Sequence, residues 1–195
     1  MDLDTRVFLA INAFARTTPW LHPIAQAFGN YGVVLFGTLM LAGWWTARTA
    51  TDSAPMAAAV WTPLAALLAL GVNQPIADAV GRTRPCNALH DIVVLHCNTD
   101  PGLPSDHAVL AGAATPGLWL VSRRLGTITA IATIAMAFTR IYIGAHYPAD
   151  VLAGIALGIV VALTGYALVR RLLQRVITAL SRTPARPLVR QGPTT

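Results

Sequence analysis

The chain has 195 residues, of which 55% are hydrophobic and only 11% are charged, about half the charged fraction of an average soluble domain. This composition excludes an ordinary water-soluble globule. All fourteen basic residues are Arg and all eight acidic residues are Asp, which gives a net charge of +6. In a soluble protein this charge would suggest a nucleic-acid partner, but uncharged runs of 15 to 31 residues indicate a lipid bilayer and no nucleic acid.

Residues 1–28 do not form a clear membrane span. Val7–Ala15 is only nine apolar residues long, and Pro19 and Pro23 interrupt the stretch after it. No basic stretch precedes the apolar run, so we do not expect a cleavable signal peptide. We predict that residues 1–28 form an N-terminal unit, an interfacial or partly inserted helix.

The rest of the chain contains five apolar stretches that suit a hydrocarbon layer needing about 20 residues per helical crossing. They lie at 30–47, 54–78, 105–122, 125–142 and 148–170. None shows the alternation of a membrane barrel, so all five are read as helices. The sequence therefore predicts an all-α polytopic membrane bundle of five to six transmembrane helices. It occupies residues 29–175, and a cytoplasmic tail follows at 176–195.

The Arg residues are divided unequally between the two faces that alternating spans would define. One face carries Arg48, Arg123, Arg124, Arg170, Arg171, Arg175 and the tail residues Arg182, Arg186 and Arg190. The other carries Arg82, Arg84 and Arg140. Because basic residues favour the cytoplasmic side, the first face is expected to be cytoplasmic. We thus predict a multi-pass protein of the cell membrane whose segments 81–104 and 143–147 face outside.

The first polar cluster is Gly81-Arg82-Thr83-Arg84-Pro85. Pro85 biases Arg84 toward an extended conformation, in which side chains two residues apart point the same way. Two adjacent guanidiniums can bind an anion. The alternative is a surface anchor that contacts lipid headgroups.

The second cluster is Pro104-Ser105-Asp106-His107, directly before an apolar run. Ser105 suits a helix N-cap, and Asp106 in the first turn complements the helix dipole. A capped helix explains both residues without any function. The alternative is a phosphate cradle made from the helix N-terminus and the Ser hydroxyl, with His107 as proton donor.

The third cluster runs from Thr139 to Asp150 and contains Arg140 and His146. Pro148 suits the first position of the last helix, which places Asp150 where its carboxylate can reach back toward His146. A carboxylate that fixes one imidazole nitrogen leaves the other free to attack. Asp150 could instead merely cap its helix, with His146 a turn residue. However, Arg140 at the end of an apolar run is costly near lipid unless it faces an anion.

Together the three clusters resemble the signature motifs of the type 2 phosphatidic acid phosphatase superfamily, which also includes vanadium-dependent haloperoxidases. The short length and the Pro-Ser-Asp-His variant are similar to the bacitracin-resistance type of undecaprenyl-diphosphate phosphatase. Two positions depart from the family pattern. Ala77 stands where the first motif usually has Lys, and Thr139 replaces the common Ser of the third motif. Arg82 could substitute in part for the missing Lys, although Arg is not a flexible point charge.

The resemblance implies a mechanism. His146 would attack phosphorus and form a phosphohistidine, Asp150 would orient it, and His107 would protonate the leaving oxygen and then activate water. The phosphoryl oxygens would be bound by Arg84, Arg140, Ser105 and the backbone of 105–107, with Arg82 and Asp106 beside them and Asp106 orienting one of the arginines. No cofactor and no metal are expected, because a two-metal phosphatase needs more bridging carboxylates than Asp106 and Asp150 supply. His22, His90 and His96 are expected to be non-catalytic.

The expected reaction is hydrolysis of a membrane lipid phosphate, a polyprenyl diphosphate such as the undecaprenyl or decaprenyl carrier. Alternatives are a phosphatidate or phosphatidylglycerophosphate phosphatase and a degenerate, non-catalytic lipid-phosphate binder or transporter. Vanadate-dependent halide oxidation fits less well, because those proteins are soluble. The oligomeric state does not follow from the sequence.

Cys86 and Cys97, the only two cysteines, both lie in the segment predicted to face outside. In an oxidising compartment a disulfide between them is expected. Two free thiols, or a zinc site with His90 and His96, are the alternatives.

Overall fold

The computed structural model describes residues 1–190, most of which are helical. In chain order these are α1 (Leu3–Thr17), the short 3-10 helix η1 (Pro19–Leu21), α2 (His22–Ala47), α3 (Ser53–Val80), α4 (Pro85–Ala88), α5 (Asp106–Val121), α6 (Arg123–Tyr142), α7 (Pro148–Leu180) and α8 (Arg186–Val189). No strand occurs within these 190 residues, so the predicted all-α class is confirmed.

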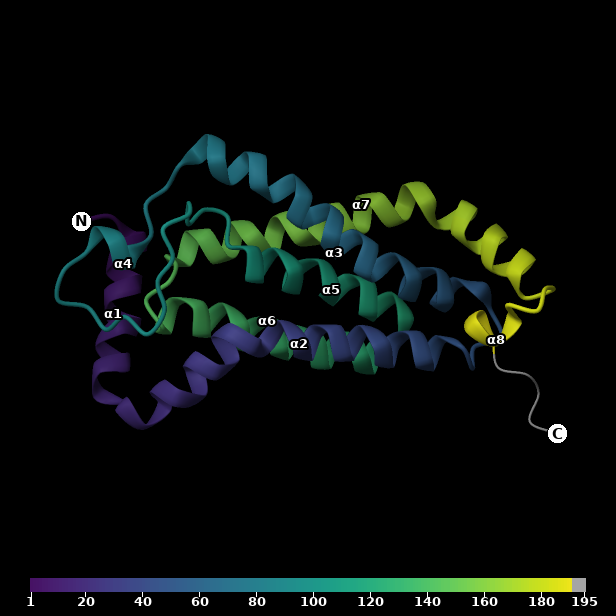
Figure 1. Ribbon diagram of the computed structural model, residues 1–195, viewed down its shortest axis with the longest axis horizontal. Helices are drawn as coiled ribbons and strands as arrows, with labels where there is room; N and C mark the ends of the chain where they lie inside the picture. The colour runs from purple at the N-terminus through teal and green to yellow at the C-terminus, as the bar shows by residue number, and fades with distance from the viewer. Residues whose placement is uncertain (191–195) are drawn as a thin grey trace.

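Five of these helices, α2, α3, α5, α6 and α7, run side by side as an elongated bundle (Figure 1). α5 is central, since it packs against α7, α3, α6 and α2. α1 lies across one end of the bundle, together with α4 and the 89–104 loop, and α8 lies at the opposite end (Figure 1). The end covered by α1 is called the α1 end below, and the other the α8 end.

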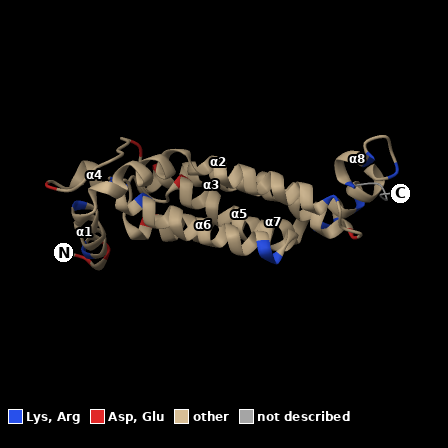
Figure 2. Ribbon diagram, turned by 90° about the horizontal axis from the view of Figure 1, so that it is seen from below, with Lys and Arg blue, Asp and Glu red and all other residues tan. Residues whose placement is uncertain are grey.

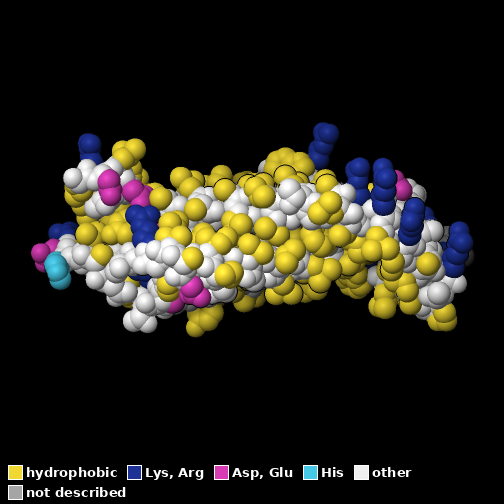
Figure 3. All heavy atoms as spheres, turned by 90° about the horizontal axis from the view of Figure 1, so that it is seen from above, with side chains coloured by type: hydrophobic (Ala, Val, Ile, Leu, Met, Phe, Trp, Pro, Cys, Tyr) yellow, Lys and Arg dark blue, Asp and Glu magenta, His cyan; other side chains and the backbone are white. Residues whose placement is uncertain are grey.

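Charged residues gather at the two ends of the bundle, and the long middle section is almost free of them (Figure 2). Apolar side chains cover the outside of that middle section (Figure 3). Four helical stretches are long and apolar enough to cross a membrane, namely Pro19–Ala47, Ala54–Ala88, Arg123–Tyr142 and Pro148–Leu180. α5 has only 16 residues and is surrounded by the other helices, so the count of five to six spans stays a prediction.

The region 1–28 contains α1, η1 and the start of α2. α2 begins at His22 and continues without a break past residue 28, and α7 continues past residue 175 to Leu180. Whether α1 enters the lipid stays a prediction, and so does the division of the chain at 28 and 175. Residues 191–195 of the predicted tail lie outside the described residues.

Glycines let α5 and α7 approach closely. A Cβ built on Gly158 of α7 would come within 2.2 Å of the backbone oxygen of Val109, and one on Gly112 of α5 within 2.4 Å of the backbone oxygen of Ile155. Gly154, one turn before Gly158, meets the carbonyl of Ser105 in the same way, at 2.7 Å. Small residues spaced four apart commonly permit such helix contacts in membranes. The contact fixes the start of α5 against the start of α7.

Two of the three helix boundaries at the α1 end have clear local causes. α3 ends at Gly81, whose left-handed φ of 60° suits glycine. α5 starts after Ser105. α7 starts at Pro148, the favoured residue type at the first helical position, and a capping box joins Tyr147 and Asp150 around that start. The polar sequence clusters therefore lie at helix ends, where backbone groups are free to bind a ligand.

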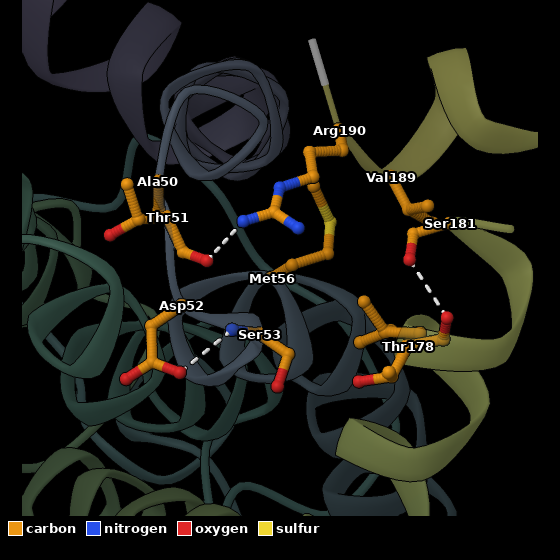
Figure 4. A pocket seen from close by; sticks show the side chains of 10 residues that line it. Ala50, Thr51, Asp52, Ser53, Met56, Thr178, Ser181, Val189 and Arg190 are labelled. Atoms are coloured by element: carbon orange, nitrogen blue, oxygen red, sulfur yellow. Dashed lines mark hydrogen bonds between the residues drawn. The ribbon is translucent and has the colours of Figure 1, made fainter. Parts of the chain in front are cut away.

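A pocket of about 180 Å³ lies at the α8 end, between the α2–α3 turn and the C-terminal segment (Figure 4). Arg190 donates to the carbonyl of Thr51 there, and Asp52 accepts from the backbone N–H of Ser53. The remaining polar side chains around it are hydroxyls, so it contains no nucleophile paired with a base. The candidate active site lies at the other end.

Candidate active site

The three polar clusters meet at the α1 end of the bundle. Arg82 and Arg84 follow α3, Ser105 begins α5, and His146 and Asp150 belong to the turn and first helical residues that follow α6. Backbone hydrogen bonds join the clusters: the N–H of Ser105 donates to the carbonyl of Asp150 at 3.0 Å, and the N–H of Gly102 donates to the carbonyl of Arg82 at 2.8 Å.

His146 is the central side chain of this site and is only 1% exposed. Its Nδ1 lies 2.8 Å from the carbonyl oxygen of Gly102, and because a carbonyl can only accept, Nδ1 carries the proton. Nε2 is then the unprotonated nitrogen, and it lies 2.6 Å from a terminal nitrogen of Arg84, which donates to it. The ring therefore presents a lone pair directly beside a guanidinium.

Asp150 contributes differently from the sequence prediction. Its Oδ2 accepts from the backbone N–H of Tyr147 at 2.9 Å and lies 3.7 Å from Nδ1 of His146. The hydrogen bond that fixes the imidazole tautomer is thus made with the carbonyl of Gly102. The Asp150 carboxylate lies on the same side of the ring as a fully buried negative charge. At that distance Asp150 can stabilise positive charge that develops on the ring.

Burial lowers the pKa of His146 to about 4, and the positive charges of Arg140 and Arg84 act in the same direction, although Asp150 opposes them. The imidazole is therefore neutral at neutral pH. A neutral imidazole has the lone pair that a nucleophile needs.

Arg84 is 4% exposed and has its donors satisfied. Besides His146, it donates to the backbone oxygens of Asp100, Ala145 and Pro101 and forms a 2.6 Å ion pair with the Asp100 carboxylate. This ion pair keeps the pKa of Asp100 below its usual range, although the partial burial of the carboxyl acts against it. The loop around residue 100 thus holds the guanidinium against the nucleophile.

Arg140 and Ser105 are buried with unused hydrogen-bonding atoms. Arg140 is 1% exposed, and its terminal nitrogen donates to the carbonyl of Gly29 at 3.2 Å. Its Nε has no partner, nor has Oγ of Ser105, and within residues 1–190 no carboxylate lies within 4.0 Å of this guanidinium. A buried, unpaired charge is costly. An anion bound between Arg84 and Arg140 would supply the missing partner.

Two further histidines lie near these arginines. His107, in the first turn of α5, is partly buried and close enough to Arg140 for the charge of the guanidinium to act on it. His96, on the 89–104 loop, has its pKa lowered by burial and then by the charges of Arg140 and Arg84. Of the two, His107 lies at a helix start, where a bound phosphate would also meet free backbone N–H groups.

The side chain of Asp106 does not orient either arginine of the first cluster, so that expectation is wrong. Its Oδ1 accepts from the side-chain amides of Asn73 at 2.6 Å and Gln74 at 3.0 Å. The helical rotation between Ser105 and Asp106 turns the carboxylate toward α3. Asp106 therefore joins α5 to α3.

Arg82 was expected beside Arg84 on the phosphate, but its two terminal nitrogens are engaged by carboxylates. One lies 2.8 Å from Oδ1 of Asp150 and the other 2.5 Å from Oδ2 of Asp4. The guanidinium also lies over the Tyr147 ring, 4.3 Å from its centroid. Arg82 thus contacts the side of Asp150 away from His146.

Sequence reasoning missed two residues of this site, Gly102 and Asp4. A Cβ on Gly102 would meet Cγ of Arg84 at 3.1 Å and Oδ2 of Asp150 at 3.3 Å, so the position needs glycine for close packing. The Asp-Pro-Gly turn signal at residues 100–102 could have indicated it. Asp4 begins a row at helical spacing, with Phe8 and Asn12, which could have indicated one inward-facing side of α1.

The structure joins Cys86 to Cys97 by a disulfide. The bond connects α4, which directly follows Arg84, to the 89–104 loop, whose Asp100 pairs with Arg84. Neither free thiols nor a zinc site is present at these positions. The bridge thus braces the segment that holds Arg84.

Known proteins share this architecture. The fold is similar to the crystal structure of a transmembrane PAP2-type phosphatidylglycerolphosphate phosphatase from Bacillus subtilis, with a TM-score of 0.63 at 20% identity over 88% of each chain. Among curated sequences, undecaprenyl-diphosphatase BcrC of Bacillus subtilis (strain 168) is 24% identical over 93% of this chain and 97% of its own length. The putative undecaprenyl-diphosphatase YbjG of Escherichia coli (strain K12) is also 24% identical, over 82% of this chain and 79% of its own.

The PAP2 superfamily model matches residues 58–174, which include all three polar clusters. This match covers more than half of the chain and confirms the resemblance that the motifs indicate. The chain therefore belongs to the PAP2 superfamily and is one of its multi-pass membrane lipid phosphatases.

Proposed function

We propose that this phosphatase hydrolyses a polyprenyl diphosphate at the outer face of the cell membrane through a phosphohistidine on His146. The observation that carries the proposal is the neutral, buried imidazole whose Nε2 lies 2.6 Å from Arg84. Arg140, whose charge acts on this imidazole, and Ser105, whose backbone N–H donates to Asp150, both keep buried atoms unpaired. A phosphate bound there would satisfy those atoms and present its phosphorus to Nε2.

The first chemical step forms a bond between Nε2 of His146 and phosphorus and breaks the bond from phosphorus to the leaving oxygen. The negative charge of the bound phosphate favours the protonated form of His107. His107 then donates its proton to the leaving oxygen, which prevents the build-up of negative charge on the leaving group. The imidazole becomes positively charged, and the Asp150 carboxylate 3.7 Å away stabilises it. The carbonyl of Gly102 keeps the proton on Nδ1 throughout.

The second step releases the phosphate. His107, now neutral, takes a proton from water as the water oxygen attacks phosphorus, and the bond from phosphorus to Nε2 breaks. Inorganic phosphate leaves, and both histidines return to their starting forms. Arg84 and Arg140 stabilise the charge on the equatorial oxygens in both transition states. We propose that no metal takes part, because Arg84 and Arg140 supply the positive charge that metal ions supply in a two-metal phosphatase. Activity in excess EDTA checks this.

The orientation rests on how charge is divided between the ends of the bundle. Nine of the fourteen arginines lie at the α8 end, and seven of the eight aspartates lie at the α1 end (Figure 2). Because basic residues favour the cytoplasm, we infer that the active site faces outside. The Cys86–Cys97 disulfide supports this, since disulfides persist in oxidising compartments. A protease added outside intact cells should leave a C-terminal tag uncut.

The choice of substrate rests on the relatives. BcrC, which is matched along nearly the whole of both chains, is named an undecaprenyl-diphosphatase, as is a protein of Sulfolobus acidocaldarius that is 29% identical over 51% of this chain. Phosphatidylglycerophosphate hydrolysis is the second candidate, because the similar solved structure is titled as a phosphatase for that lipid.

A substrate panel separates the two candidates. The purified full-length chain is supplied with a C55 polyprenyl diphosphate, phosphatidylglycerophosphate or phosphatidate in mixed micelles, and released inorganic phosphate is measured, with His146→Gln as control. We expect kcat/KM for the diphosphate to be at least about tenfold higher than for either of the other two lipids, a difference of about 1.4 kcal/mol. A preference for phosphatidylglycerophosphate would replace this proposal with the second candidate. Lack of turnover on all three, with binding retained, would indicate the non-catalytic alternative.

A further inference from the structure

α1 makes direct contact with the catalytic turn, although the sequence assigns this segment no chemical role. Phe8 is fully buried and packs edge-on against Tyr147, with ring centroids 5.4 Å apart. One turn further on, the amide of Asn12 donates to the carbonyl of Val93 and accepts from its N–H, at 2.7 and 2.9 Å. One side of α1 is therefore fixed to both the turn and the 89–104 loop.

Asp4 continues the same side of α1 by one turn and contacts the start of α7. Its Oδ1 accepts from the backbone N–H of Ala149 at 2.8 Å, and its Oδ2 pairs with Arg82 at 2.5 Å. Arg82 in turn pairs with Oδ1 of Asp150. The result is a carboxylate–guanidinium–carboxylate chain from α1 to the residue behind the nucleophile.

We propose that Asp4, acting through Arg82, is a positioning residue for Asp150, so that α1 belongs to the active site. This inference rests on the proposed function of His146 and Asp150. Asp150 is fully buried and has one oxygen toward His146 and the other toward Arg82. Asp4 fixes this arrangement from two directions, through the guanidinium and through the first turn of α7. Neither Asp4 nor Arg82 touches the phosphate.

This assignment differs measurably from a phosphate-binding role for Arg82. A positioning residue affects the chemical step, whereas a phosphate ligand also affects ground-state binding. For Asp4→Asn and Arg82→Ala we expect kcat to fall about tenfold, since small displacements of catalytic groups cost rate steeply. We expect KM and the inhibition constant of orthovanadate, a phosphate analogue, to stay within about twofold of wild type.

Three variants provide the controls. Asp4→Glu keeps the charge and should recover most of kcat. Asp4→Asn combined with Arg82→Ala should be no slower than the slower single variant, because both act through Asp150. Asp2→Ala removes the N-cap of the same helix, where Asp2 accepts from the backbone N–H of Thr5, without touching Arg82 or α7. It should keep wild-type kcat, although α1 is weakened.

The experiment measures kcat, KM and vanadate inhibition of the full-length variants with C55 polyprenyl diphosphate, and relates each rate to the amount of vanadate-binding protein. Three results would each overturn the role of Asp4 and leave the proposed function intact. They are wild-type kcat in Asp4→Asn, tenfold weaker vanadate inhibition in Arg82→Ala, and a loss of kcat in Asp2→Ala equal to that in Asp4→Asn. Wild-type turnover in a His146→Gln control assayed alongside would overturn the proposed function itself.

Discussion

Replacing Arg140 by Met is expected to make the ligand-free protein more stable while it removes activity. The guanidinium is 1% exposed, has no carboxylate partner among the described residues, and leaves Nε without a hydrogen bond. Its single bond goes to the carbonyl of Gly29. In the absence of phosphate, the protein therefore bears the cost of a buried charge, and an unbranched apolar side chain of similar length removes that cost.

The expected gain can be worked out from these contacts. Removing an unsatisfied buried donor stabilises the fold by about 1–3 kcal/mol, whereas losing the hydrogen bond to Gly29 destabilises it by about 1 kcal/mol. The net stabilisation is therefore between zero and about 2 kcal/mol, and its midpoint of about 1 kcal/mol corresponds to a rise in Tm of roughly 2–4 °C for a chain of this size. Turnover should fall by about 10²–10³, the usual effect of losing one transition-state donor.

Arg84→Met is the matched control. Arg84 also lies in the site, but it makes an ion pair with Asp100 and four further hydrogen bonds, so its removal should lower Tm as well as activity. Thermal unfolding is followed in detergent with and without orthovanadate, which at about 100 times its Kd should stabilise the wild type by about 2.7 kcal/mol. A lower Tm for Arg140→Met, or an undiminished vanadate effect, would refute the assignment of Arg140 as an anion ligand.

Three further predictions concern stability. Gly158→Val should destabilise the protein by roughly 3 kcal/mol, because its Cβ meets the Val109 carbonyl at 2.2 Å; an unchanged Tm would contradict this packing. Because the pKa of His146 is lowered to about 4 in the fold and is near 6.5 when unfolded, the unfolded chain binds more protons between these values. The wild type should thus lose on the order of 3 kcal/mol as pH falls from 6.5 to 4, and the Tm of His146→Gln should fall less over that range. Cys86→Ser with Cys97→Ser should cost about 2–3 kcal/mol and lower kcat; wild-type Tm and kcat would exclude a bracing role for the disulfide.

The helices of the bundle were predictable because their sequences meet one dominant physical requirement. A backbone that crosses lipid must satisfy its own hydrogen bonds, so long uncharged runs become helices, and cap residues such as Gly81 and Ser105 mark their ends. The same reasoning did not predict where the helices of the N-terminal region begin and end. Pro19 and Pro23 suggest interruption, yet Pro is well tolerated at a helix start, and α2 begins at His22 with Pro23 in its first turn.

The candidate site was predictable where residues sit at helix ends and not where loops fold back. His146, Arg84 and Arg140 lie together because alternating helices bring their motifs to one end of the bundle. The partner of His146 could not be read from spacing, since Gly102 reaches it through a loop with no periodic pattern. The contact of Asp4 with Arg82 joins residues 78 positions apart, and only the docking of α1 brings them together.

Trapping of a phosphoenzyme shows directly whether His146 is the nucleophile. The purified chain is mixed with a polyprenyl diphosphate labelled with 32P in its terminal phosphate and quenched within milliseconds, in alkali to preserve the N–P bond. We expect acid-labile label on the peptide that contains His146. This label should accumulate when His107 is replaced and should be absent from His146→Gln. Wild-type hydrolysis by His146→Gln, or label on a different residue, would contradict the assignment of His146 as the nucleophile.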